Sequence, residues 1–131
     1  MALSQKLFTV EEANAILPQL RRHVPRIRGL AAALQSSCPL GGDRDQAVRS
    51  LASSGGTLVP HTYFLGLLAL RSELAALDAL GVILKDLEEG LVDFLHMREG
   101  KVVFLCWRLG EAEVRFWHEV GAGYDARKPL P

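Results

Sequence analysis

The stretch GLVDFLHMREGKVVFLCWRLG, residues 90–110, decides the fold of this chain. Two runs rich in β-branched and aromatic residues, 91–97 and 102–108, lie on either side of Glu99-Gly100. Such runs are typical of β-strands, and an acidic residue followed by glycine is typical of a tight two-residue hairpin turn. The stretch therefore predicts an antiparallel β-hairpin.

The same pattern continues on both sides of this hairpin. Residues 82–85 and 113–119 read as further strands, and the turns at 86–90 and 109–112 each contain glycine. Connections this short allow only antiparallel neighbours. We therefore expect a four-stranded antiparallel β-meander over residues 82–119.

Two helices are predicted before the meander. Thr9 and Glu12 form a capping-box pattern, which indicates a helix over residues 8–35. Its apolar residues recur with 4-3 spacing, a narrow seam that favours packing against another helix. Pro18 and Pro25 interrupt the pattern seven residues apart, and we expect them to curve the helix without breaking it. The seam residues are Ala13, Leu17, Leu20, Val24, Ile27, Ala31 and Leu34.

A second helix, over residues 62–80, repeats the seam spacing and ends at Gly81. Residues 36–60, rich in Ser and Gly, read as a variable connector, and residues 120–131 as a C-terminal tail. The fold class is α+β: one domain, 1–131, in which a long antiparallel helical hairpin packs on the meander. Because the first helix is longer than the sheet, the uncovered part of its seam predicts a homodimer formed through the helices.

Composition excludes several classes of protein. The chain has 15 basic and 15 acidic residues among 131, so the basic surplus of a nucleic-acid-binding protein is absent. We interpret the four arginines within 21–28 as a solvated helix face, which argues against nucleic acid as a partner. Charges interrupt the most apolar window, 64–84, so no membrane span is expected. Cys38 and Cys106 form no zinc-finger or disulfide pattern, which favours a reducing, cytoplasmic location.

The faces of the meander follow from its turns. If Glu99-Gly100 and Gly110-Glu111 are both two-residue turns, an apolar face that includes Trp107, Phe116 and His118 meets the helices. The opposite face then places Asp93, Cys106 and Arg115 in one row, with Arg108 beside Glu113 and Trp117 exposed. We interpret this mixed face as the binding side. The candidate ligand-binding residues are Asp93, Cys106, Arg108, Glu111, Arg115, Trp117, His118 and Arg127.

Each candidate also has a structural interpretation. A cysteine in a strand near Arg115 has the surroundings of a nucleophile, but buried strand cysteines usually act as small hydrophobic residues. His96 and His118 are possible metal ligands, or else hydrogen-bonded histidines at the edge of the core. The tail either remains mobile or folds back, so that Arg127 meets an anionic group above the sheet.

Three motifs in order resemble a known family. FTVEEANAILPQLR, GVILKDLEEGLVDF and LCWRLGE followed by FWHE and RKP are similar to a bacterial family of uncharacterised proteins, domain of unknown function twenty-two-oh-three. The resemblance implies no activity. It narrows a metal hypothesis to Asp93, Glu111 and His118, which the predicted register does not place on one face. The family's polar motif falls on Lys85, Asp86, Asp93, Cys106, Trp107, Arg108, Glu111, Trp117, His118, Gly123 and Arg127.

The leading hypothesis is a small dimeric module that binds a ligand or a protein and is not an enzyme, with no metal or cofactor. The alternative is a metal-dependent hydrolase centred on His118 with Asp93 and Glu111, which would require a divalent metal.

Overall fold

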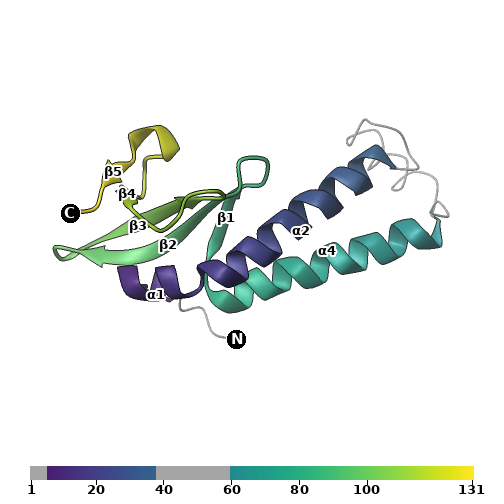
Figure 1. The fold of residues 1–131 in the computed structure, drawn as a ribbon, viewed down its shortest axis with the longest axis horizontal. Helices are drawn as coiled ribbons and strands as arrows, with labels where there is room; N and C mark the ends of the chain where they lie inside the picture. Colours follow the sequence, from purple (N-terminus) through teal and green to yellow (C-terminus); the bar gives the residue numbers. More distant parts are fainter. Residues whose placement is uncertain (1–5, 38–59) are drawn as a thin grey trace.

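The computed structural model describes residues 6–37 and 60–131. The predicted connector lies almost wholly outside these residues, and so does Cys38. Within them, three α-helices precede a five-stranded antiparallel sheet, so the α+β class is confirmed (Figure 1). None of the helices in the described ranges has a stretch long and apolar enough to cross a membrane.

The predicted first helix is two helices, α1 (Val10–Ala15) and α2 (Leu17–Ser36). The Thr9–Glu12 capping box starts α1 as expected. The prediction of a continuous helix is wrong at Ile16, where the backbone leaves the helical conformation at φ −96° and ψ 0°. Pro18 gives the physical reason, because it has no N–H for the carbonyl of Asn14 and its ring would clash with that carbonyl. Pro25 lies inside α2 without ending it.

The third helix, α4 (His61–Leu80), ends at Gly81, whose φ of 84° is the left-handed cap conformation that the sequence predicts. It runs antiparallel to α2, and the two form a hairpin that extends well beyond the sheet (Figure 1). Gly66 allows close packing here, since a Cβ at this position would lie 2.9 Å from Cδ2 of Leu34. The seam of α2 is therefore used within the hairpin and against the sheet.

The strands are β1 (Ile83–Asp86), β2 (Leu91–Arg98), β3 (Lys101–Arg108), β4 (Phe116–His118) and β5 (Lys128–Pro129), paired in that order. Pairing of Asp93 with Cys106 confirms the two-residue turn at Glu99-Gly100. The sheet has five strands where four were predicted, because the tail folds back through a 3-10 turn, η1 (Tyr124–Ala126), and adds β5.

The register of β4 differs from the prediction by one residue. Cys106 pairs with Phe116 and Leu105 with Trp117, whereas a two-residue turn would pair Cys106 with Arg115. A shift of one residue turns every side chain of a strand to the other face. His118 therefore lies on the face of Asp93 and Cys106, and Trp117 lies on the helix side; the predicted sides of both are wrong.

The core lies between the helices and one face of the sheet. Trp107, Phe94 and Leu105 are fully buried there against Leu20, Val24 and other residues of the α1–α2 seam. The predicted apolar face is thus correct for β2 and β3. The outer face is not open to solvent, since Asp93, Phe104 and Cys106 are buried as well. Figure 1 shows β4, η1 and β5 on the side of the sheet away from α1.

Candidate functional site

Three polar side chains meet in the buried layer of the outer face. Asp93 comes from β2, Cys106 from β3 and His118 from β4, and each is only 2 % exposed. One ligand-capable atom from each lies within 4.8 Å of the other two. The register shift of β4 turns His118 to this face, where it pairs with Phe104, while Phe116 takes the place opposite Cys106 that the sequence predicted for Arg115. We call these three residues the buried cluster.

Hydrogen bonds orient His118 within the cluster. Its Nδ1 lies 2.8 Å from the carbonyl oxygen of Glu119, which can only accept, so Nδ1 carries a proton and donates it. Its Nε2 lies 3.1 Å from Oδ2 of Asp93. The second ring nitrogen is thus directed at the carboxyl group.

Burial controls the protonation of the other two members. Desolvation raises the pKa of Asp93, and the nearby charges of His118 and Lys85 only partly oppose it. Desolvation and the adjacent Asp93 raise the pKa of the Cys106 thiol to about 12, although Arg127 acts in the opposite direction. At neutral pH Cys106 is therefore a thiol, and in this state it is not an activated nucleophile.

Beside the cluster, Arg127 forms an ion pair with Glu111. Two guanidinium nitrogens lie 3.0 Å from the two carboxylate oxygens, a bidentate pair. The guanidinium also stacks on the rings of Phe116 and Tyr124, each with its centroid 4.1 Å away. The tail thus folds back so that Arg127 meets an anionic group above the sheet, which was one of the two alternatives left open by the sequence.

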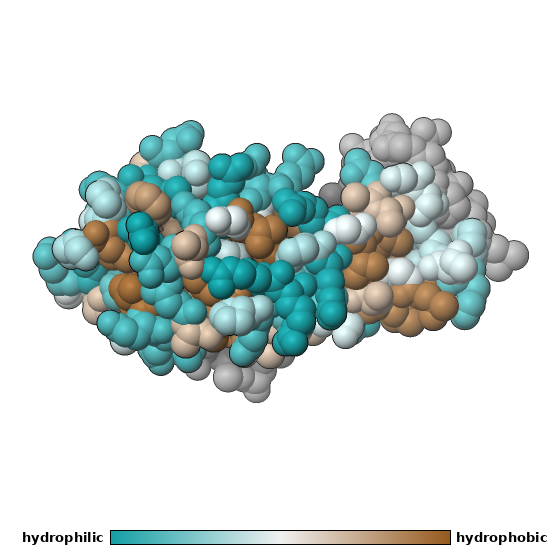
Figure 2. Space-filling view, in the orientation of Figure 1, coloured by the Kyte–Doolittle hydropathy of each residue, from teal (hydrophilic) through white to brown (hydrophobic). Residues whose placement is uncertain are grey.

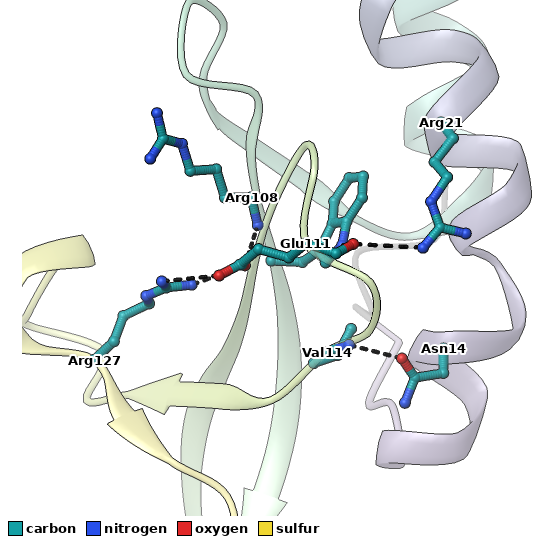
Figure 3. A network of polar contacts seen from close by, with 7 residues as sticks. Asn14, Arg21, Arg108, Glu111, Val114 and Arg127 are labelled. Carbon is teal, nitrogen blue, oxygen red and sulfur yellow. Dashed lines mark hydrogen bonds and ion pairs between the residues drawn. The ribbon is translucent and has the colours of Figure 1, made fainter.

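Glu111 also organises the loop that sets the register of β4 (Figure 3). Its side chain accepts from the backbone N–H of Arg108 at 2.7 Å. Its carbonyl oxygen accepts from the indole N–H of Trp107 at 3.0 Å. Farther along, the backbone N–H of Val114 donates to Oδ1 of Asn14 in α1 at 2.7 Å. These bonds hold a loop longer than the predicted two-residue turn.

The remaining predicted residues lie apart from the cluster. Arg115 is exposed and pairs with Glu113, so the predicted Arg108–Glu113 pair does not form. Arg108 instead pairs with Glu89. It borders a surface cavity of about 420 Å³ whose lining also includes Arg28, Glu111 and Tyr124.

Trp117 lies between two basic side chains. The cations of Arg98 and Lys128 lie 4.7 and 4.9 Å from its ring centroid.

Three of the four arginines of the basic strip in α2 form bonds with other parts of the chain. Arg21 donates to the carbonyl of Ala112, Arg28 donates to that of Glu88, and Arg26 pairs with Glu73.

Sequence reasoning missed Lys85, Phe104, Asn14 and Tyr124 as neighbours of the site. The ammonium of Lys85 lies 4.8 Å from the ring centroid of Phe104, which in turn contacts the ring of His118. The family motif already contained Lys85, and that was the available signal. Asn14 and Tyr124 carried none, because their contacts depend on how the loop and the tail fold back.

Comparison with known proteins adds the family and nothing about activity. No curated protein and no solved structure matches the chain. A family model described as an uncharacterized conserved protein, DUF2203, matches residues 6–130, as the three sequence motifs predicted. The chain therefore belongs to this family of uncharacterised conserved proteins.

Proposed function

We propose that the protein is a small non-catalytic binding module that assembles as a homodimer through α4 and binds its ligand on the outer side of the sheet. Uncovered apolar surface on α4 is the observation that carries the proposal. Four large apolar residues in the first half of this helix are between 43 % and 48 % exposed. They are Phe64, Leu65, Leu67 and Leu68.

Helical spacing places Phe64 and Leu68 on the side of α4 turned away from α2, and it places Leu65 and Leu67 on the two flanks of that side. The contacts with α2 use Gly66 and Glu73, and Leu77 is the buried residue of the helix. Hydrophobic residues are visible along α4 at the hairpin end in Figure 2. Contiguous apolar surface of this kind usually marks a contact with another protein.

A second copy of the chain fits this surface best. The exposed charges in the second half of α4 include Arg71 and Asp78, one of each sign, so two antiparallel copies need not repel each other. Two hairpins that pack through such helices make a four-helix bundle, a common way for hairpins to bury their outer faces.

Light scattering coupled to size-exclusion chromatography tests the assembly. We expect the wild-type chain to elute with the mass of a dimer at micromolar concentration. Leu68→Glu should give a folded monomer, because a carboxylate buried in an apolar contact costs several kcal/mol, on the order of 3 or more.

Met97→Glu is the matched control. Met97 is 48 % exposed, as apolar and as accessible as Leu68, but it lies at the end of β2 rather than on the hairpin. This variant should remain a dimer. A wild-type chain that is monomeric at all concentrations, or a Leu68→Glu variant that remains dimeric, contradicts the proposal.

The ligand side is supported by the grouping of predicted residues on the outer face. Asp93, Cys106 and His118 come together, and Arg127 and Glu111 form the adjacent pair. The hydrolase alternative has less support, because both carboxylate oxygens of Glu111 are held by Arg127. A cytoplasmic location fits a free, buried thiol at Cys106, which belongs in a reducing compartment.

A further inference from the structure

We propose that the buried cluster is a metal site, in which Asp93, Cys106 and His118 together bind one zinc-class divalent cation. This names a ligand for the outer side of the sheet and so rests in part on the proposed function. Three different strands supply the three donors, which places a carboxylate oxygen, a sulfur and an imidazole nitrogen around one point.

The orientation of His118 supports this assignment. In the neutral ring, the bond from Nδ1 to the carbonyl of Glu119 leaves the lone pair on Nε2, which is the nitrogen directed at the cluster. Histidine ligands of metals are held in this way by a hydrogen bond from the other ring nitrogen to a carbonyl or carboxylate. That neutral tautomer is the one that a metal requires, and the geometry favours it once the metal takes the place of the proton shared with Asp93.

The spacing is close to that of a metal site. In a tetrahedral zinc site, bonds of roughly 2.0–2.3 Å place neighbouring ligand atoms about 3.3–3.8 Å apart. Here Nε2 of His118 and Oδ2 of Asp93 lie 3.1 Å apart, and all three donor atoms lie within 4.8 Å. The three donor atoms are therefore close enough together to surround one cation.

The donor set selects the class of cation. A sulfur donor excludes magnesium and calcium, which prefer oxygen ligands, and favours zinc or cobalt(II). Binding displaces the thiol proton of Cys106, since the thiolate is the ligand.

The site is better placed for a structural or regulatory metal than for a catalytic one. Three surface cavities bordered by described residues, of about 420, 210 and 550 Å³, include none of the three cluster residues in their linings. A cation there would join β2, β3 and β4, and would hold the C-terminal segment on the sheet.

Titration with cobalt(II) tests the proposal. The full chain, freed of any histidine tag and stripped of metal by a chelator under reducing conditions, is titrated with cobalt(II) chloride. We expect one cobalt per chain, a near-ultraviolet thiolate-to-cobalt charge-transfer band, and visible bands of tetrahedral intensity. Zinc should displace the cobalt and remove both signals.

Variants identify the ligands. Cys106→Ser keeps nearly the size of the side chain and should abolish the charge-transfer band. His118→Gln removes a ligand and should weaken binding by more than the roughly 10–100-fold that loss of an outer-shell partner costs. One matched variant should bind cobalt as the wild type does. His96→Gln changes the histidine on the other face of the sheet, whose Nδ1 bonds to the carbonyl of Phe8.

Circular dichroism of each metal-free variant shows whether it folds. If a variant does not fold, the cobalt titration of the wild-type chain still tests the metal site. Absence of a charge-transfer band in the wild type at stoichiometric cobalt overturns the metal site, and so does a band that Cys106→Ser leaves unchanged. The dimer proposed above is measured by mass in metal-free buffer, so failure of either proposal is recognised independently of the other.

Discussion

At the scale of single residues, the site depends on which neighbour each polar group finds. The sequence correctly placed Asp93 and Cys106 side by side, because the two-residue turn at Glu99-Gly100 determines that pairing. It assigned Arg115 to the third place in the row, where the structure has Phe116, with His118 on the same face. The error arose from one assumed turn length, since alternation is reliable only within a strand whose register is known.

The Arg127–Glu111 pair gives a prediction at this scale. Arg127→Ala should lower the free energy of unfolding by about 1.5–3 kcal/mol, because it leaves a half-buried carboxylate without its two charge-assisted hydrogen bonds. Urea denaturation measures the loss.

Arg115→Ala is the control for this change. Arg115 forms an exposed pair with Glu113, so its removal should alter stability by no more than about 0.5 kcal/mol. Equal losses in the two variants would mean that the Arg127 pair contributes no more than an exposed one.

At the scale of elements, the sequence predicted those helices and strands whose ends are marked by a local signal, and it missed those whose ends depend on contacts with other segments. The bounds of α4 and the β2–β3 hairpin follow from local signals, namely a cap glycine and a turn glycine. Pro18 indicates a disturbance of the helix near Ile16, but the sequence alone does not distinguish a bend from the break that the structure has. The two-residue strand β5 had no periodicity to detect, because it exists only through its pairing with β4.

The turn between β1 and β2 supports a prediction about glycine. Gly90 has φ 69°, and a Cβ there would lie 2.7 Å from Cβ of Leu109, next to the backbone. Gly100 has φ 77° but nothing within 4 Å. Both alanine variants carry the left-handed backbone cost of about 1–2 kcal/mol, and Gly90→Ala adds the collision, roughly 1–3 kcal/mol more.

Thermal or urea denaturation of Gly90→Ala and Gly100→Ala separates these two costs. If the two variants unfold at the same denaturant concentration, Leu109 moves aside freely and the close approach has no energetic role.

The contact between α2 and α4 predicts how the hairpin responds to acid. The hydrogen bond from His23, assisted by the charges of His23 and Arg26, lowers the pKa of Glu73 below its ordinary value of 4.5. A carboxyl group with a lowered folded-state pKa stabilises the fold fully above its unfolded value, and this contribution is lost as pH falls through the folded value. Stability should therefore decline below about pH 4.5.

Denaturation of Glu73→Gln over a series of acidic pH values should show a shallower decline than the wild type. His23→Gln keeps the carboxyl group but removes its partner, and should reproduce the same flattening. If the free energy of unfolding of both variants declines with falling pH as steeply as that of the wild type, then other groups cause the acid sensitivity.

At the scale of the whole molecule, the architecture could be predicted from the sequence. The burial of the outer face of the sheet by the C-terminal segment could not. Helix periodicity and strand alternation gave a hairpin on a sheet, with Trp107 in the core and Cys106 on the opposite face. The burial of Cys106 and Asp93 depends on β4 and on the returning tail, including Arg127. These contacts join distant parts of the chain, and no local pattern encodes them.

The seven residues from Leu109 to Arg115 connect β3 to β4. They leave an odd number of residues between the paired Cys106 and Phe116, whereas a two-residue turn would leave an even number. If one of them were deleted and the loop kept its present length by taking in Phe116, Trp117 would lie opposite Cys106 in place of Phe116, and every later side chain of β4 would change face. Trp117 would then point toward Asp93, and His118 would enter the hydrocarbon layer under the helices. Within this short segment a length change is therefore more damaging than almost any replacement, and single-codon deletions there should be far rarer in functional variants than substitutions.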